Sequence, residues 1–249
     1  MNMTFFKSFK MKSLTFTLLA LSLFTQVQAD TIAFIGTGNV TQALAFPFAG
    51  AGHDIVLGHR DPQREDNQAL ADRLGGNTSV VLPAEAVVGA DIVVVAVPGG
   101  ALTSVVAGLG DLSGKIIIDP TNPLYPDPED GLANPLFPIS NAEMIQNMLP
   151  DSYVVKAFNT LGVGTMNDPE SAGGPVTIPY AGNDDDAKAV VHELIELLGL
   201  HALDVGKVRH AYVLEGMLAL WANGIGLGME SGTMFDYHLQ VHPSNQQLR

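Results

Sequence analysis

The feature that most constrains this chain is a regular alternation of short β-branched runs with longer helical stretches, which continues from Thr31 almost to the last residues. Such alternation is typical of βαβ units that build a parallel sheet. The pattern predicts eight strands, at Thr31–Ile35, Asp54–Leu57, Ser79–Leu82, Asp91–Val97, Lys115–Asp119, Tyr153–Ala157, Thr177–Ala181 and His201–Val205. It also predicts six helices, at Val40–Ala49, Pro62–Leu74, Ala101–Gly108, Ala142–Leu149, Asp184–Leu198 and Ala211–Ile225.

The predicted strands indicate the fold class. Several are apolar at every position, as expected when helices cover both faces of a sheet. Two stretches, Pro120–Asn141 and Gly162–Pro175, fit neither pattern, and we expect long loops there. No repeat or charged linker divides the chain. We therefore expect an α/β fold, a Rossmann-type, doubly wound and mainly parallel sheet, in a single compact domain over residues 30–225, with a C-terminal tail over residues 226–249.

The first 29 residues have the pattern of a secretory signal peptide. Lys7, Lys10 and Lys12 precede the uncharged run Leu14–Phe24, and residues 27–29 (VQA) supply a cleavage site for signal peptidase. A membrane anchor is the alternative, but a spanning helix needs about 20 apolar residues and this run is shorter. We therefore expect a cleaved leader, export to the periplasm or the medium, and no membrane span after processing.

Composition excludes several classes of function. Because the chain has no cysteine, it forms no disulfides, thiolate metal sites or cysteine nucleophiles. The 26 acidic and 12 basic residues give a net charge of −14, and cleavage of the leader would remove three lysines and no acid. A nucleic acid or an anionic membrane would be repelled. We expect no nucleic-acid partner, and we assign no metal ligand.

A dinucleotide-binding pattern follows the first predicted strand. The sequence GTGNVT from Gly36 supplies two glycines of the G-x-G-x-x-G motif at the expected opening of a helix. Gly36 permits a tight turn, Gly38 permits close approach of a pyrophosphate, and the amides of Asn39 and Val40 lie at the positive helix end. Thr41 replaces the third glycine. We expect a bound pyrophosphate there, and a purely structural glycine turn is the alternative.

The residues after the second strand predict which dinucleotide binds. An NAD site needs a carboxylate at this point to accept the ribose hydroxyls, and that carboxylate would repel a 2′-phosphate. Here the strand is followed by His59 and Arg60, with Arg64 one helical turn later. Guanidinium groups pair well with phosphate, so this pattern favours NADP. The alternative is a group of ordinary solvated charges, and Asp61 is a mild objection to the phosphate site.

Five segments occur in one order along the chain: Gly36–Val40 (GTGNV), Gly58–Arg60 (GHR), Val95–Pro98 (VAVP), Asp119–Pro123 (DPTNP) and Val155–Thr160 (VKAFNT). Together they resemble the coenzyme F420-dependent NADP oxidoreductase family, whose domain also occurs in the cytoplasmic part of the STEAP metalloreductases. The resemblance runs from the first strand to about residue 225. It implies a compact Rossmann domain that binds NADP and passes hydride to a flavin or to a deazaflavin such as F420.

The resemblance also implies roles for single residues. Positions 37–40 would hold the pyrophosphate, and positions 59, 60 and 64 would hold the 2′-phosphate. Positions 97 and 98 would line the cofactor, and positions 122 and 157 would approach the nicotinamide. His59 departs from the serine that is usual in the family. The complete set of expected cofactor-binding residues is Gly36, Thr37, Gly38, Asn39, Val40, His59, Arg60, Arg64, Val97, Pro98, Asn122 and Ala157.

The expected chemistry needs no positioned acid or base. Hydride transfer between a nicotinamide and a flavin-type ring depends on stacking and distance, because the cofactors carry the reaction. We therefore assign no catalytic residue. Lys156 is a candidate general acid, but a lysine at a strand end is more often a surface charge with a packed stem, and we predict that role for it.

The predicted leader and the predicted cofactor point to different compartments. The leader predicts export, whereas pyridine nucleotides such as NADP are kept inside cells. One hypothesis is an exported NADP-dependent oxidoreductase with a small-molecule redox partner. The alternative is an exported non-catalytic Rossmann module that binds a phosphorylated ligand or a partner protein. We also expect that the chain can form a homodimer.

Overall fold

The computed structural model describes residues 29–126, 129, 131, 133–134, 138–231 and 239–240. Almost all of the predicted leader and most of the predicted C-terminal tail lie outside the described residues.

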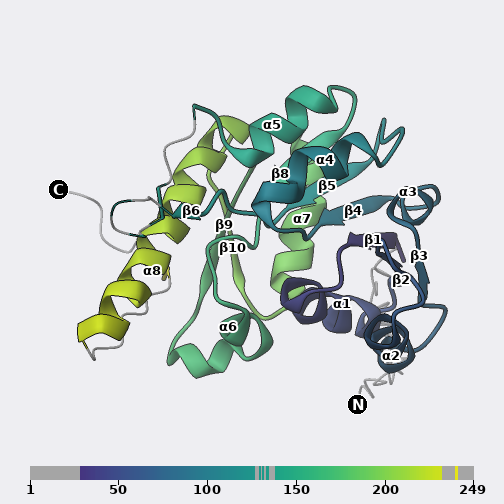
Figure 1. The fold of residues 1–249 in the computed structure, drawn as a ribbon, viewed down its shortest axis with the longest axis horizontal. Helices are drawn as coiled ribbons and strands as arrows, with labels where there is room; N and C mark the ends of the chain where they lie inside the picture. Colours follow the sequence, from purple (N-terminus) through teal and green to yellow (C-terminus); the bar gives the residue numbers. More distant parts are fainter. Residues whose placement is uncertain are drawn as a thin grey trace, which may run out of the picture.

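An eight-stranded sheet forms the centre of the molecule (Figure 1). Its strands are β1 (Thr31–Ile35), β2 (Asp54–Gly58), β3 (Ser79–Val81), β4 (Ile92–Val95), β5 (Ile116–Asp119), β8 (Tyr153–Lys156), β9 (Thr177–Gly182) and β10 (His201–Asp204). Each corresponds to a predicted strand. The first expected loop contains a small antiparallel pair, β6 (Tyr125–Pro126) and β7 (Ala133–Asn134).

The strand order is β10-β9-β8-β5-β4-β1-β2-β3. Neighbouring strands are parallel except β8 and β9, so β9 and β10 run against the other six. The chain moves outward from β1 to β3 and then crosses back to β4, which lies on the other side of β1. This reversal creates a crevice at the carboxyl ends of β1 and β4, where ligands bind in sheets of this kind. The prediction of a Rossmann-type, mainly parallel α/β fold is confirmed.

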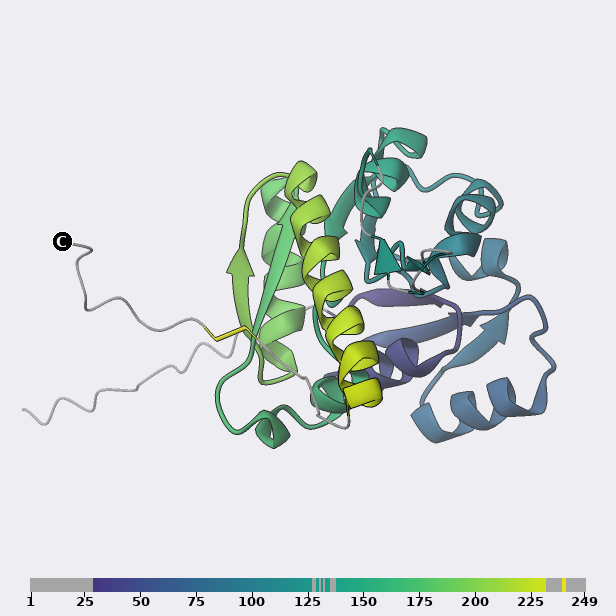
Figure 2. The same ribbon diagram turned by 60° about the vertical axis from the view of Figure 1, so that its left-hand side comes forward.

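Helices cover both faces of the sheet (Figures 1 and 2). Ile32 and Phe34 of β1 belong to a core that includes residues of α1, α2, α6 and α7, whereas Ala33 and Ile35 belong to a second core with α3, α4 and α5. This alternation explains the apolar strands, because successive side chains point to opposite faces. The helices are α1 (Asn39–Gly50), α2 (Glu65–Leu74), α3 (Pro83–Ala86), α4 (Leu102–Ala107), α5 (Asn141–Met148), α6 (Val163–Asn167), α7 (Asp185–Leu197) and α8 (Ala211–Ser231).

The described residues also form the short 3₁₀ turns η1 (Gly99–Ala101), η2 (Pro169–Ala172) and η3 (Val208–His210). Helix α6 and η2 lie inside the second expected loop. The last helix, α8, packs beside α5 and β9 (Figure 2). Within the described ranges, no helix combines the length and the apolar character that a membrane crossing requires.

Candidate functional site

The turn from β1 to α1 is made by Gly36. Its φ of +103° lies in a region that residues with side chains rarely adopt. A Cβ at this position would lie 2.4 Å from the carbonyl oxygen of Ala96, which follows β4. The Gly36 N–H also donates to the carbonyl oxygen of Gly58, at 2.9 Å. The turn is therefore held between the ends of β2 and β4, and only glycine fits it.

The first turn of α1 is open. Gly38 is its N-cap residue and makes no side-chain capping bond. A Cβ on Gly38 would have no heavy atom within 4 Å. The first amides of a helix have no partner within the helix and attract anions. Thr41, in the position of the third glycine, is buried, and its hydroxyl donates to the carbonyl oxygen of Gly36 at 2.9 Å. The helix start thus combines a fixed backbone with open space in front of it.

A cavity of about 770 Å³ lies over this turn, at the carboxyl edge of β1, β2 and β4. Its volume falls in the range of small-molecule and cofactor sites, roughly 300–1,000 Å³. Nine of the twelve expected residues line it: Gly36, Thr37, Gly38, Asn39, His59, Arg60, Arg64, Val97 and Pro98.

The other three expected residues do not line this cavity. Val40 lies in the first turn of α1, and its partly buried side chain packs against the core. Ala157 is completely buried. Asn122 and Asn159 are joined by two hydrogen bonds. The Asn122 Nδ2 donates to the backbone carbonyl oxygen of Asn159 at 3.2 Å, and the Asn159 Nδ2 donates to the side-chain Oδ1 of Asn122 at 3.0 Å. Their roles toward a nicotinamide stay predictions.

The arginines of the cavity differ in their partners. Arg60 is exposed and forms no ion pair within the described part of the chain, so Asp61 does not neutralise it. Arg64 lies 2.6 Å from Asp66, but these side chains are 56% and 74% exposed. Exposed pairs of this kind contribute about 0–1 kcal/mol, so a phosphate could replace the carboxylate. The Arg73 guanidinium lies 4.9 Å from the centre of the Phe46 ring.

Asn67 of α2, which is not among the residues expected from the sequence, connects the glycine turn to the loop after β2. Its side-chain Oδ1 accepts from the Thr37 hydroxyl at 2.7 Å. Its Nδ2 donates to the Asp61 carbonyl at 2.8 Å and lies 2.9 Å from His59 Nδ1. The residue is 2% exposed. The sequence does carry one signal for this residue. Asn67 is three residues before Leu70, so both lie on the buried face of α2, and a buried side-chain amide needs hydrogen-bond partners.

The prediction of a surface role for Lys156 is wrong. Its side chain is fully buried at the end of β8. The Nζ lies 2.9 Å from Asp119 and 2.7 Å from Glu215, and it also donates to the carbonyl oxygen of Thr121. A charge completely removed from water needs such partners. Burial, opposed by Lys156, raises the pKa of the Glu215 carboxyl above its ordinary value.

This group of residues, here named the Lys156 cluster, consists of Asp119, Thr121, Asn141, Lys156 and Glu215. Thr121 donates to Asp119 through its backbone N–H at 2.8 Å and its hydroxyl at 2.6 Å. Asn141 donates its backbone N–H to Glu215 and its Nδ2 to the Thr121 hydroxyl, both at 2.8 Å. The cluster therefore joins the loop after β5 to β8, α5 and α8.

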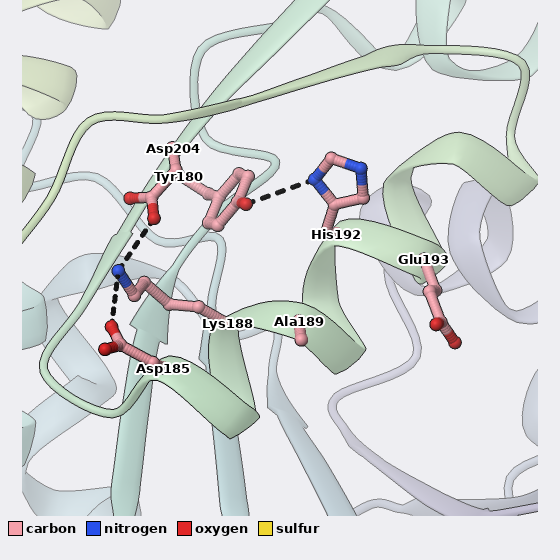
Figure 3. A pocket seen from close by; sticks show the side chains of 7 residues that line it. All are labelled: Tyr180, Asp185, Lys188, Ala189, His192, Glu193 and Asp204. Atoms are coloured by element: carbon pink, nitrogen blue, oxygen red, sulfur yellow. Dashed lines mark hydrogen bonds and ion pairs between the residues drawn. The ribbon is translucent and has the colours of Figure 1, made fainter.

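A second cavity, of about 370 Å³, lies between α7 and the strands β9 and β10 (Figure 3). Its lysine, Lys188, is 3.0 Å from Asp185 and 2.7 Å from Asp204. The hydrogen bond to Asp204 raises the pKa of Lys188. Glu193 is a third carboxylate in the wall. Because this cavity carries more acid than base, it does not suit a phosphate. Among the described residues, no three His, Asp or Glu side chains are grouped for a metal ion.

Known proteins resemble this chain in sequence. A family model described as NADP oxidoreductase, coenzyme F420-dependent, matches residues 31–123. The F420-dependent NADP reductase of Methanocaldococcus jannaschii is 29% identical over 198 residues, which cover 74% of this chain and 87% of that protein. Metalloreductase STEAP3 of Rattus norvegicus is 28% identical over 191 residues, which cover 76% of this chain. The chain spans only 36% of the length of that metalloreductase.

Solved structures also resemble this chain, and one example is matched over nearly its full length. It is a crystal structure from Arthrobacter sp. FB24, assigned as an F420-dependent NADP reductase, with a TM-score of 0.73 and 32% sequence identity. The match covers 82% of this chain and 96% of the other. The two proteins therefore share both the α/β sheet and its connections.

Proposed function

Because this chain belongs to the family of coenzyme F420-dependent NADP oxidoreductases, we propose that it binds NADP(H) in the cavity at the carboxyl edge of β1, β2 and β4. Membership confirms the resemblance seen in the sequence and makes the chain an NADP-dependent oxidoreductase. We further propose that its hydride acceptor or donor is a flavin or a deazaflavin such as F420. Related proteins are described as F420-dependent NADP reductases, and this supports F420 as the redox partner. The residues that line the cavity support NADP(H) as the bound nucleotide.

One observation carries the proposal. The same cavity holds an uncovered helix start at Gly38 and a guanidinium at Arg60 that forms no ion pair among the described residues. A diphosphate suits the first feature and an ester phosphate suits the second. NADP carries both groups, whereas NAD lacks the ester phosphate. The residues present therefore fit NADP better than NAD.

Each side of the cavity has a separate task in this proposal. The backbone amides after Gly38 bind the diphosphate, and Arg60 and Arg64 bind the 2′-phosphate. Val97 and Pro98, which follow β4, supply an apolar wall that excludes water. Bound NADPH supplies the hydride, so the chain's contribution is to bind and orient the reactants.

Export is a separate proposal. We propose that residues 1–29 direct the chain out of the cytoplasm, on the strength of their sequence pattern alone. An exported non-catalytic module for a phosphorylated ligand is the alternative function. One observation favours that alternative: Asn122 is paired with Asn159 and does not line the cavity. A dimer stays a prediction.

The test separates these functions by titrating purified protein with NADPH, NADH and ADP-ribose, with nicotinamide fluorescence and melting temperature as readouts. We expect NADPH to bind at least about tenfold more tightly than NADH, since a charge-assisted phosphate contact is worth about 1.5–3 kcal/mol. Addition of F420 or FMN should then oxidise bound NADPH, which absorbance records. Absence of nucleotide binding would contradict the oxidoreductase. Tight binding without oxidation by either acceptor would favour the binding module.

A further inference from the structure

We propose that Asn67 is a positioning residue for the 2′-phosphate pocket. In this proposal its side chain holds Thr37 of the glycine turn and His59 of the β2–α2 loop in one arrangement. It thereby fixes the His59 ring with its Nε2–H as the donor available to a phosphate. The inference rests on the proposed function, because it assigns a residue that determines selectivity between NADP and NAD.

The Asn67 amide uses all of its hydrogen-bonding groups. The oxygen accepts from the Thr37 hydroxyl, at 2.7 Å. One N–H donates to the Asp61 carbonyl at 2.8 Å, and the other faces His59 Nδ1 at 2.9 Å. Because the Asp61 carbonyl requires a donor, the nitrogen must lie on that side of the amide. The side chain is 2% exposed, so water cannot replace these bonds.

The contacts of His59 then select one form of its ring. Its Nδ1 faces two N–H donors, from Asn67 at 2.9 Å and from the Asp61 backbone at 3.0 Å. The Asp61 carbonyl also lies 3.0 Å from Nδ1. Because two N–H groups and only one carbonyl face Nδ1, the neutral ring makes more hydrogen bonds with Nδ1 as the acceptor and the hydrogen on Nε2. His59 lines the cavity together with Arg60 and Arg64, and Asp66 is the acid nearby.

Loss of the Asn67 amide would change this donor pattern. The Nδ1 would then face one N–H donor and one carbonyl, so the preference for a hydrogen on Nε2 would be lost. In rings with the hydrogen on Nδ1, the Nε2 presents a lone pair that repels phosphate. This change affects a ligand with a 2′-phosphate. Loss of the Thr37 bond affects every dinucleotide equally, because the glycine turn serves the diphosphate that NADPH and NADH share.

The test compares Asn67→Ala with Gln68→Ala in titrations with NADPH and NADH. Gln68 is a matched control, because its exposed side chain donates at 2.8 Å to Pro62 in the same loop without touching Thr37 or His59. We expect Asn67→Ala to weaken NADPH about tenfold or more and NADH about threefold or less. Gln68→Ala should leave both affinities unchanged. Asn67→Asp keeps the shape and the acceptor for Thr37, but it loses both donors and adds a negative charge to the cavity, so it should weaken NADPH at least as much as Asn67→Ala does.

A double-mutant cycle with His59→Ala tests whether Asn67 acts through His59. If it does, Asn67→Ala in the His59→Ala background should no longer change the ratio of NADPH to NADH affinity. A selective loss that persists in that background would overturn the inference, and so would equal losses for the two nucleotides in the single variant. Failure of the unmodified protein to bind NADPH would instead overturn the proposed function, together with this inference.

Discussion

Arg60 lies two residues after β2 and Lys156 is the last residue of β8, at the same edge of the sheet, yet the two charges have opposite surroundings. Lys156 has no exposed surface and lies between two carboxylates. Arg60 is exposed, faces a cavity and forms no ion pair with any described residue. In this fold a cation is available to a ligand where no carboxylate of the chain pairs with it. Lys188 lies between the two cases, because both of its carboxylate partners are partly or largely exposed (Figure 3).

The largest effect is expected from Lys156→Met, which removes the buried cation. Without the ammonium, Asp119 and Glu215 would be buried carboxylates with no cation beside them. We expect the free energy of unfolding, measured in urea, to fall by about 3–5 kcal/mol. Lys115→Met is the control, because Lys115 donates to the Ala90 carbonyl and forms no ion pair within 4 Å among the described residues, so its loss should cost about 1 kcal/mol. Equal losses for the two variants would show that Lys156 has no special structural role.

Arg60→Glu tests the exposed cation that lines the nucleotide cavity. A carboxylate beside the 2′-phosphate removes the charged contact and adds repulsion, so NADPH affinity should fall about 100-fold. NADH affinity should change about threefold or less, because NADH lacks that phosphate. The free energy of unfolding should stay within about 0.5 kcal/mol, as expected for an exposed residue without partners. Arg209→Glu makes the same charge change outside the cavity. A similar loss of NADPH affinity there would mean that only overall charge matters.

The smallest effect concerns the pH dependence of the Lys156 cluster. Burial, opposed by Lys156, raises the pKa of Glu215 above its ordinary value of 4.5. The folded state therefore binds the Glu215 proton more tightly than the unfolded state does. Proton binding by Glu215 thus stabilises the fold fully when the pH is below the ordinary pKa, and this stabilisation is lost as the pH rises through the pKa of the folded state. As the pH rises above this ordinary value, the unfolding free energy of the native chain should fall relative to that of Glu215→Gln. Urea titrations at several pH values measure the difference, and a change in the opposite direction would refute the assignment.

Much of the fold could be predicted because its signals are local. Each strand and each major helix is marked by a short run of residues, and the glycine turn is recognisable from its place after β1. The predicted cavity residues cluster for the same reason, since consecutive parallel strands end at one edge. The reversal of β9 has no such local marker, because an apolar strand reads the same in either direction.

The burial of Lys156 could not be predicted from its neighbours in sequence. Its partners Asp119 and Glu215 lie 37 residues before it and 59 residues after it. Only the folded chain brings them together, so a rule based on strand ends gave the wrong environment. Asn67 was missed for a related reason, because its partners come from the glycine turn and from the loop after β2.

The tightness of the turn at Gly36 has a kinetic consequence. Its backbone is held by Gly58 on one side and closely packed against Ala96 on the other, so little conformational entropy remains for a ligand to remove. Association should then proceed without a slow ordering step at this turn. Differences in affinity among ligands and variants should appear mainly in the rate at which the nucleotide departs.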